Sequence, residues 1–286
     1  MASEVSKIET GGVTRPIKDA TAREDNLRLF QQNNCLYAGR DLVTVFASEI
    51  ANYSDEWAWI RARIKAANYE GIYIGDYISV TMNNEIVKMQ VAGIDTYYRT
   101  TDQQLGHHID FISKDCYSGT VQWNTTDYNN GNADSPYPYM VSNLHSYLIN
   151  TLYGYLPEKV KNQIANKITL MEQRYSSAGA LTDSTSWGWQ DLGALWVPNE
   201  YEVFGSVVWG TKGWSSGQSV QYPIFANSYL NRIKGASNGG GRSYWWLSSV
   251  RSGNSANACN VGGDGNAYYW GASNAARVPV CFRITA

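Results

Sequence analysis

The chain has 286 residues, enough for one large domain or for a small domain beside a large one. Its net charge is −2 and no basic stripe runs through it, which excludes the electrostatic footprint of a nucleic-acid-binding protein. Charged residues make up only 17% of the chain, whereas aromatic residues make up 13%, so the surface relies on Tyr, Asn and Ser more than on ion pairs. No apolar run approaches the ~20 residues of a membrane span. The first residues lack the apolar core of a Sec signal peptide, so we expect neither a membrane span nor a Sec signal peptide.

The N-terminal part changes from a polar arm to a helical segment. Residues 1–35 have no apolar period, which predicts an extended or disordered arm. Apolar residues at helical spacing predict a helix over residues 41–67, interrupted near residues 52–54 and restarting at Ser54. Two tryptophans of this helix, Trp57 and Trp59, are expected at its exposed surface.

A hairpin follows the helical segment. Residues 72–82 and 86–94 alternate apolar and polar side chains around Asn83-Asn84, a pair that tolerates the positive φ of a tight turn. Residues 108–113 predict a further strand, and the Thr, Asn, Asp, Gly and Pro of residues 117–138 predict a loop.

The second half begins with two predicted helices and ends in short strands. Residues 141–155 carry apolar side chains on one side, and residues 158–168 follow Pro157, which suits the first helical position. Gly, Ser and Trp then dominate, which indicates short strands and long loops. Aromatic and β-branched residues predict two late strands, at residues 244–247 and 278–284.

The residues between these two late strands are nearly all Asn, Ser, Gly, Ala and Tyr. They contain too few apolar side chains to build a core of their own. Tyr and Trp offer large rigid contacts and Ser, Gly and Asn offer adaptable hydrogen bonds, so the composition is typical of a binding surface. Of the three consecutive aromatic residues Tyr268, Tyr269 and Trp270, at least two should be exposed.

The same stretch contains a restricted set of residue types. From Ser248 to the end there is no Lys, Glu, Gln or Met, although the rest of the chain contains all four. Asn codons that mutate only at their adenines cannot produce these residues, and residues 250–275 fit that restriction except at Trp270. The alternative is that a solvated β-loop simply favours Gly, Asn and Ser.

The C-terminal motifs resemble the variable proteins of diversity-generating retroelements, in which a C-type-lectin-like domain ends in an Asn-rich variable stretch between two conserved strands. The resemblance covers roughly residues 70–286. Two departures are Ser248, where Arg is usual, and the order Arg-Val-Pro in place of Val-Arg-Pro. The matching segments are residues 195–205, 245–249, 258–261, 264–266 and 277–284.

A second resemblance concerns residues 11–23, which are similar to the start of tail or baseplate structural proteins of phages that infect Gram-positive bacteria. Together the two resemblances imply a phage or prophage receptor-binding protein, located in the virion tail or outside the cell. The implied partners are a protein or glycan on a bacterial cell surface and phage tail or baseplate components. A homo-oligomer, with a trimer as one form, would display several copies of the surface.

The expected fold class is α+β. It is a C-type-lectin-like fold with short strands, two helices and long loops, preceded by an N-terminal arm and helix. Residues 1–68 would serve attachment or oligomerisation, and residues 69–286 would bind ligand through a variable region at about residues 248–277. The expected ligand-binding residues are Arg251, Asn254, Asn257, Asn260, Asp264, Asn266, Tyr268, Tyr269, Trp270, Ser273 and Asn274.

We expect no catalytic residues, cofactor or metal. His108 and Asp110 share a strand face and are interpreted as a structural polar pair, and Arg283 as a structural arginine of the last strand. Val197-Pro198-Asn199 lacks the acidic or amide residue that begins the calcium-binding triplet of lectins.

Two alternatives to a variable binding protein stay open. Formylglycine-generating enzymes share the lectin-like fold and use a reactive Cys pair, but Cys259 and Cys281 are far apart in sequence and no His accompanies them. An invariant structural tail component is the other alternative. A bridge between Cys259 and Cys281 is compatible with neighbouring strands, although the sequence favours buried free thiols.

Overall fold

The computed structural model describes residues 7–10, 13–16, 37–100, 105–184, 186–213 and 219–286. Contacts divide the chain into the units Met1–Tyr37 and Ala38–Ala286, so the second unit begins earlier than the boundary at residue 68 that the sequence indicated. In the first unit, β1 (Lys7–Thr10) pairs antiparallel with β2 (Val13–Pro16). The rest of the arm expected over residues 1–35 lies outside the described residues.

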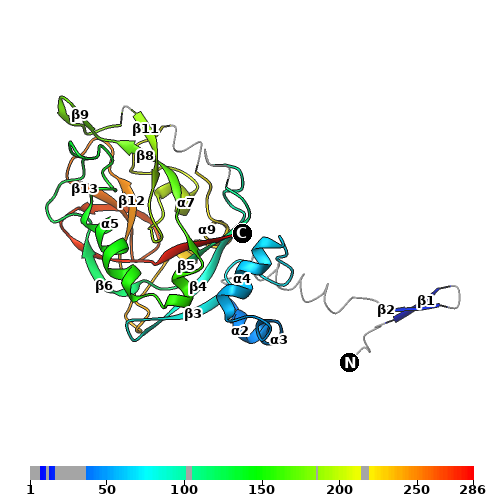
Figure 1. The fold of residues 1–286 in the computed structure, drawn as a ribbon. Helices are drawn as coiled ribbons and strands as arrows, with labels where there is room; N and C mark the ends of the chain where they lie inside the picture. Colours follow the sequence, from blue (N-terminus) through cyan, green and yellow to red (C-terminus); the bar gives the residue numbers. More distant parts are fainter. Residues whose placement is uncertain (1–6, 11–12, 17–36, 101–104, 185, 214–218) are drawn as a thin grey trace. The chain divides into compact units, whose positions relative to one another are not determined.

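Two five-stranded sheets form the framework of the second unit (Figure 1). In the first sheet the last strand of the chain returns beside strands from the first half, so the two ends of this unit share one sheet. The sheet order is β3 (Tyr77–Met82), β4 (Glu85–Ile94), β5 (His108–Ser113), β16 (Cys281–Thr285) and β7 (Ile164–Ala165).

The predicted hairpin around Asn83-Asn84 is confirmed. Strands β3 and β4 pair from Met82 opposite Glu85 to Tyr77 opposite Gln90. Asn83 and Asn84 have φ values of 45° and 67°, the left-handed conformation that a two-residue turn of this twist requires. Asn adopts this conformation more readily than most residues with a side chain.

The second sheet holds the C-terminal strands. Its neighbours are antiparallel except for one parallel pair, in which Trp245 lies opposite Arg277. The sheet order is β14 (Ala267–Gly271), β13 (Asn257–Val261), β12 (Trp245–Val250), β15 (Ala275–Val278) and β6 (Tyr117–Gln122).

The loop predicted from residue 117 onward was wrong at its start, because β6 is a strand. Tyr117 and Val121 are buried, while Thr120 is exposed and Ser118 and Gln122 are half-buried. An edge strand with only part of its side chains in the core can have a polar composition. Its pairing with β15 is a tertiary contact that local composition does not report.

The predicted interrupted helix over residues 41–67 is confirmed as α2 (Leu42–Val45), α3 (Ala47–Ile50) and α4 (Glu56–Lys65). Helix α4 is capped by Asp55 rather than by Ser54, and the Asp55 carboxylate accepts the backbone N–H groups of Trp57 and Ala58.

The expected exposure of Trp57 and Trp59 was wrong, because both are fully buried. Helix α4 contacts β16, and the Trp57 ring packs edge-on against Phe111 and Phe282, with centroids 5.4 Å away in each case. The indole of Trp59 is held by the Glu49 carboxylate, to which its Nε1 donates at 3.1 Å.

The helix predicted over residues 141–155 is confirmed as α5 (Asn143–Tyr147), a π-helical turn η1 (Leu148–Leu152) and a 3₁₀ turn η2 (Tyr153–Tyr155). The helix predicted over residues 158–168 is correct only at its start. Helix α6 (Glu158–Lys161) follows Pro157, which occupies the cap and not the first helical position. Ile164 then pairs with β16, and Ile168 begins strand β8, so sheet pairing replaces the expected helix.

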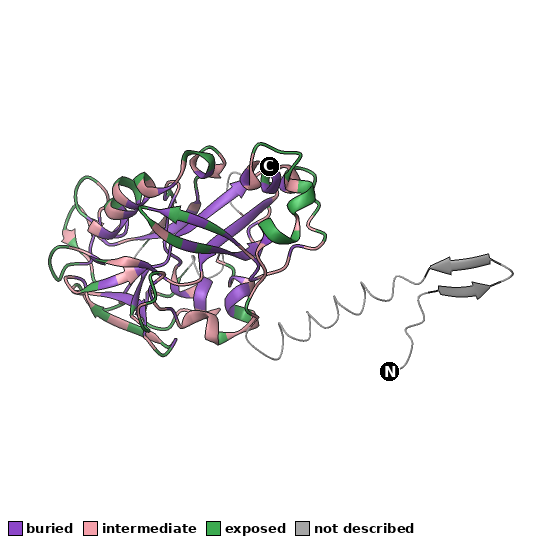
Figure 2. Ribbon diagram, turned by 90° about the horizontal axis from the view of Figure 1, so that it is seen from below, coloured by how far each residue is buried: buried purple, intermediate pink, exposed green. Residues whose placement is uncertain are grey.

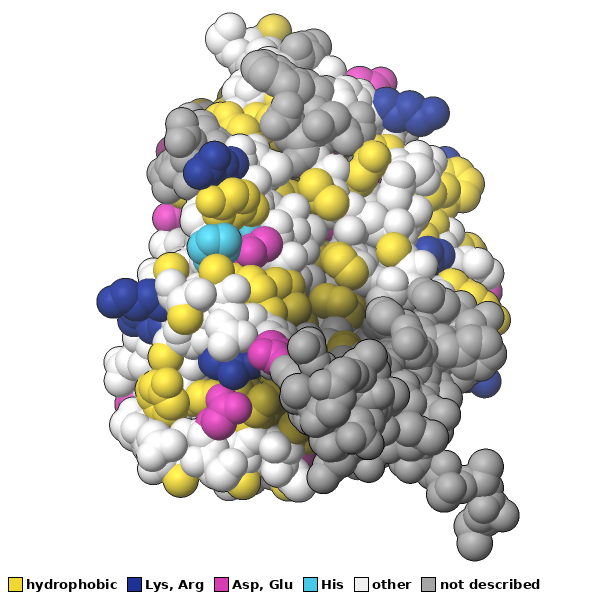
Figure 3. Space-filling model, turned by 90° about the vertical axis from the view of Figure 1, so that its right-hand side faces the viewer, with side chains coloured by type: hydrophobic (Ala, Val, Ile, Leu, Met, Phe, Trp, Pro, Cys, Tyr) yellow, Lys and Arg dark blue, Asp and Glu magenta, His cyan; other side chains and the backbone are white. Residues whose placement is uncertain are grey.

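The remaining elements are short, and the class is α+β with many strands and few helices. Buried segments lie in the middle of the second unit and exposed segments in its connections (Figure 2). On the face drawn in Figure 3, charged side chains of the described residues are scattered among hydrophobic and polar ones. No helix of the described residues is long and apolar enough to cross a membrane.

The short elements are β8 (Ile168–Gln173), β9 (Tyr175–Ser176), β10 (Gly179–Ala180), β11 (Ser186–Asp191), α7 (Glu200–Phe204), α9 (Pro223–Asn227) and η3 (Tyr229–Arg232).

Arg283 is a buried structural arginine, as predicted. Its Nε and Nη2 donate to the two carboxylate oxygens of Asp110 at 2.6 and 2.9 Å. Burial alone would raise the pKa of Asp110, but the neighbouring guanidinium holds this pKa below its ordinary value. The fully buried His108 accepts the backbone N–H of Tyr97 at Nε2, which confirms a structural role for this polar pair.

Candidate ligand-binding surface

The C-terminal stretch folds as paired strands, which its Asn-, Ser- and Gly-rich composition did not predict. Strands β13 and β14 pair residue for residue, from Asn257 opposite Gly271 to Val261 opposite Ala267. The turn between them uses Gly265 at a φ of 83° and the Asp264 carboxylate, which accepts the N–H of Asn266 at 3.1 Å. Side chains in this region therefore project from a hydrogen-bonded sheet.

Three aromatic side chains form an exposed cluster, which we call the aromatic face: Tyr244, Tyr268 and Trp270. Tyr268 and Trp270 are two residues apart on β14 and so point to the same side. The Tyr244 ring lies 5.9 Å from Tyr268 and 5.3 Å from Trp270, measured between centroids. Tyr268 is 50% exposed and Trp270 38%, which confirms that at least two of the three consecutive aromatic residues are exposed.

Tyr269 points to the opposite side of β14 and belongs to a second cluster. The Arg251 guanidinium lies 3.7 Å from its ring centroid, close enough for a cation–π contact. Arg251 also donates to the Asn257 side chain at 3.2 Å. The edge of Trp209 packs on Tyr269 with centroids 4.8 Å apart. Tyr269 is half-buried, so it supports its neighbours and also offers contact area.

Glu200 positions Trp209. Its buried carboxylate accepts the backbone N–H groups of Val208, Trp209 and Gly210 at 2.8 to 3.1 Å. Burial raises the pKa of Glu200, and these N–H groups oppose that rise. The Trp209 indole donates to the carbonyl of Ala267, and the Trp209 carbonyl accepts the N–H of Ser252.

A surface groove lies beside this second cluster. Its walls include Trp209, Lys212 and Arg251, together with Asp183 and Ser252. Asp183 accepts the Ser252 hydroxyl at 2.5 Å, a bond that holds the pKa of Asp183 below its ordinary value. The groove therefore combines an indole, two cations and one acidic side chain already engaged with the protein.

Other predicted site residues lie in three separate turns. Asn254 accepts the N–H groups of Ala256 and Asn257, which makes it a turn residue. Asp264 and Asn266 are exposed in the β13–β14 turn. In the turn before β15, Ser273 donates to Asp127 at 2.7 Å, and the Asn274 amide donates to the carbonyl of Gly271 at 3.2 Å.

Asn260 does not reach the surface, contrary to its expected role as a contact residue. It is fully buried, and neither its amide nitrogen nor its amide oxygen has a hydrogen-bond partner among the described residues. Asn260 lies opposite Trp246 and Tyr268, so large aromatic side chains surround it in the sheet. Both faces of β13 are covered at this point, because Ala258, Cys259 and Val261 are buried as well.

Sequence reasoning missed Trp209, Tyr244 and Glu200. Tyr244 directly precedes the Trp-Trp pair of β12, a weak signal that it extends the same strand. Trp209 and Glu200 gave no local signal, because their roles depend on contacts with β14 and with one another. Sequence reasoning did bring Arg251, Asn257 and Tyr269 into one site.

The cysteines give no reactive thiol in the described residues. Cys116, Cys259 and Cys281 are buried and free, as expected for the last two. Burial raises the pKa of each thiol, and the Glu200 carboxylate adds to the rise at Cys259. Cys35 lies outside the described residues. Within those residues, no group of three or more His, Cys, Asp or Glu side chains could hold a metal ion.

The fold and this surface define an α+β domain that presents aromatic side chains from a C-terminal sheet. Residues 111–286 match the family described as Domain of unknown function (DUF6273), and the chain belongs to that family. The match begins within β5 and includes β16 and every strand of the second sheet. No curated protein and no solved structure matches the chain.

Proposed function

We propose that the chain is a ligand-binding protein that displays a diversified surface, as in the variable proteins of diversity-generating retroelements. The observation that carries the proposal is the aromatic face, where Tyr268 and Trp270 project from a strand whose backbone is paired along its length. Contiguous exposed aromatic side chains are typical of binding sites, and truncating them commonly removes most of the binding energy.

The distribution of burial supports diversification. Residues 250–275 contain, except at Trp270, only residue types that Asn codons mutated at adenines can produce. Within them Tyr268, Ser255 and Asn266 are exposed, while Ala258 and Val261 are buried. Exposed side chains can change with small effects on stability, whereas buried ones cannot. A fixed sheet with replaceable outer side chains suits selection on many targets.

We further propose that the fold is C-type-lectin-like. An early hairpin, two central helical segments and late strands, with β16 returned between β5 and β7, support this assignment. The protein would act in a phage or prophage tail, or outside the cell, and contact a protein or glycan on a bacterial surface. The polar arm would join tail or baseplate components or further copies of the chain.

The buried thiols disfavour the enzymatic alternative. A formylglycine-generating enzyme needs a reactive cysteine, and thiolates form where the thiol pKa is lowered. At Cys259 and Cys281 burial raises it. The invariant structural component differs from our proposal in its purely structural role and in a surface that does not vary.

Sequencing related copies of the gene and the DNA beside it tests the proposal. We expect a nearby repeat of the coding stretch, and differences confined to adenines of that repeat within residues 250–275. Differences should be most frequent at exposed positions such as Ser255, Asn266 and Tyr268. Identical stretches in all copies would support the invariant structural component instead.

A further inference from the structure

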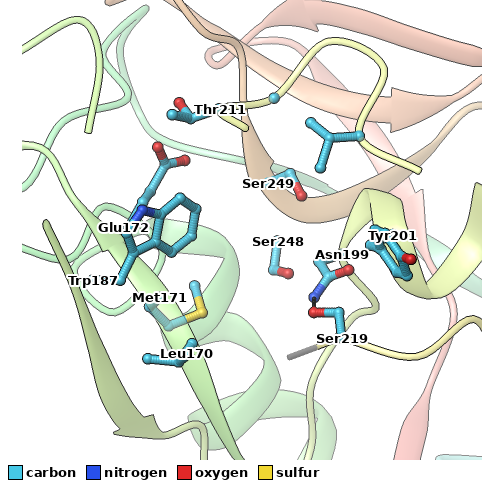
Figure 4. Close-up of a pocket in the computed structure, with 12 residues that line it drawn as sticks. Leu170, Met171, Glu172, Trp187, Asn199, Tyr201, Thr211, Ser219, Ser248 and Ser249 are labelled. Carbon is cyan, nitrogen blue, oxygen red and sulfur yellow. Dashed lines mark hydrogen bonds between the residues drawn. The ribbon is translucent and has the colours of Figure 1, made fainter. Parts of the chain in front are cut away.

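A pocket outside the aromatic face lies between the β8–β11 strand pair, the loop before α7 and strand β12 (Figure 4). Its polar walls come from Glu172, Asn199, Ser219 and Ser248, and Trp187 forms one side. Of the expected variable region, residues 248–277, only Ser248 and Ser249 at its margin line the pocket.

Glu172 and Trp187 enter the pocket together because they are direct cross-strand partners on β8 and β11. Trp187 is half-buried, which leaves part of its ring accessible. Glu172 is only 7% exposed. Its Oε2 accepts the Arg174 Nε at 3.1 Å and the Ser184 hydroxyl at 2.5 Å, whereas its Oε1 has no protein donor among the described residues.

Ser248 supplies a second oxygen to the pocket wall. It is 5% exposed, and its backbone N–H donates to the carbonyl of Pro198. Among the described residues its hydroxyl makes no hydrogen bond. On the opposite wall, the Asn199 amide donates to the Ser219 hydroxyl at 3.2 Å. Neither Glu172 Oε1 nor Ser248 Oγ is among the fully buried unpaired atoms of the described residues, so both oxygens are open to a partner that enters the pocket.

The charge of the pocket selects among ligands that could donate to these oxygens. Glu172 is paired with Arg174, which is fully buried, so the pair is neutral overall. A cationic ligand would lose its hydration without finding an unpaired anion. Neutral hydroxyl groups beside a ring with an apolar C–H face match both the oxygens and the indole.

We propose that this pocket binds one ring of a neutral saccharide without a metal ion. The apolar face of the ring packs on Trp187, one hydroxyl donates to Glu172 Oε1, and a neighbouring hydroxyl exchanges a hydrogen bond with Ser248 Oγ. This site goes beyond the proposed function, because it uses none of the aromatic face and does not depend on diversification.

Calorimetry and ligand-observed NMR of the full chain test the site. The probes are the methyl glycosides of glucose, galactose, mannose and N-acetylglucosamine, and choline is the cationic comparison ligand. We expect at least one glycoside to bind, in EDTA as well, and Ser248→Ala and Trp187→Ala to weaken it about tenfold or more. Ser48→Ala, an exposed serine of α3, is the matched control and should bind as the wild type does.

The remaining outcomes overturn the saccharide site. They are binding of choline alone, binding of no probe, or glycoside binding that neither Ser248→Ala nor Trp187→Ala weakens in variants with wild-type melting temperatures. Tyr268→Ala separates the two proposals. It should reduce binding to bacterial cells and leave glycoside affinity unchanged, so failure of the aromatic face is visible independently of this pocket.

Discussion

Trp209 and Tyr269 pack edge to face with their ring centroids 4.8 Å apart. Trp209 lies outside residues 248–277, and Tyr269 lies in the middle of them. The Trp209 indole also donates to the carbonyl of Ala267 on the same strand, a contact with the backbone that does not depend on which side chain follows. A constant aromatic side chain therefore supports β14 even if the side chains of that strand change.

Replacing Tyr268 or Tyr269 by Ala should weaken binding to the bacterial target tenfold or more, about 1.4 kcal/mol. Aromatic anchors commonly dominate binding energy, and Tyr268 is half exposed, so its removal should change stability little. Labelled protein titrated onto host cells measures the affinity. Tyr53→Ala removes an exposed tyrosine near α3 and serves as the control. Unchanged affinity for the Tyr268, Tyr269 and Trp270 variants would place the site elsewhere.

Within the variable stretch, substitutions should affect stability according to burial. Ser255→Ala changes an exposed side chain and should stay within about 0.5 kcal/mol of the wild type. Asn260→Leu replaces two unpaired buried polar atoms by methyl groups with the same branching and should raise the free energy of unfolding by about 1–3 kcal/mol. Urea denaturation measures both. A destabilised Asn260→Leu variant would mean that the amide is satisfied in solution.

Elements governed by local chemistry were predictable from the sequence. The hairpin at Asn83-Asn84 follows from alternation and from the positive φ that Asn tolerates. The interruption of the helix over residues 41–67 follows from its loss of apolar period. Exposure of Tyr268 and Trp270 follows from the absence of apolar neighbours around them.

Elements governed by distant pairing were not predictable. Strand β6 has a polar composition and is identified only by β15, which lies more than a hundred residues later. Ile164 and Ile168 join two different sheets and so end the helix predicted there. Burial of Asn260 follows from tertiary packing on both faces of β13, where its neighbours Cys259 and Val261 are buried as well. Glu200 and Trp209 become recognisable only after these strands are in place.

Binding through the aromatic face should be independent of metal ions. Hard cations require several oxygen ligands, including carboxylates. Among residues 250–275, Asp264 is the only residue with a carboxylate side chain. Its carboxylate already accepts the backbone N–H and the side-chain amide of Asn266. Titrations onto host cells in calcium and in EDTA should give the same affinity. Loss of binding in EDTA, restored by calcium, would contradict this prediction.

The Asp110–Arg283 pair should make stability depend on acid pH. The folded-state pKa of Asp110 is lowered, so its stabilising contribution is present above its ordinary pKa of 3.8 and is lost as pH falls through the lowered value. Asp110→Asn leaves Arg283 buried without its charge partner and should cost about 3–5 kcal/mol at neutral pH. Urea unfolding at several pH values should show this deficit shrinking below pH 3.8. An equal deficit at acid and neutral pH would contradict the assignment.

The N-terminal arm should mediate assembly, because its polar sequence has little apolar surface to bury alone. Contacts group residues Ala38–Ala286 into a unit of their own, so removal of residues 1–37 should leave that unit folded. Light scattering should give an oligomeric mass, with a trimer as the expected form, for the full chain and a monomeric mass for the shortened one. Binding to cells should then weaken through the loss of multivalent attachment, although each site is intact. If both proteins have the monomeric mass, the arm does not drive self-assembly and would instead attach the domain to another tail component.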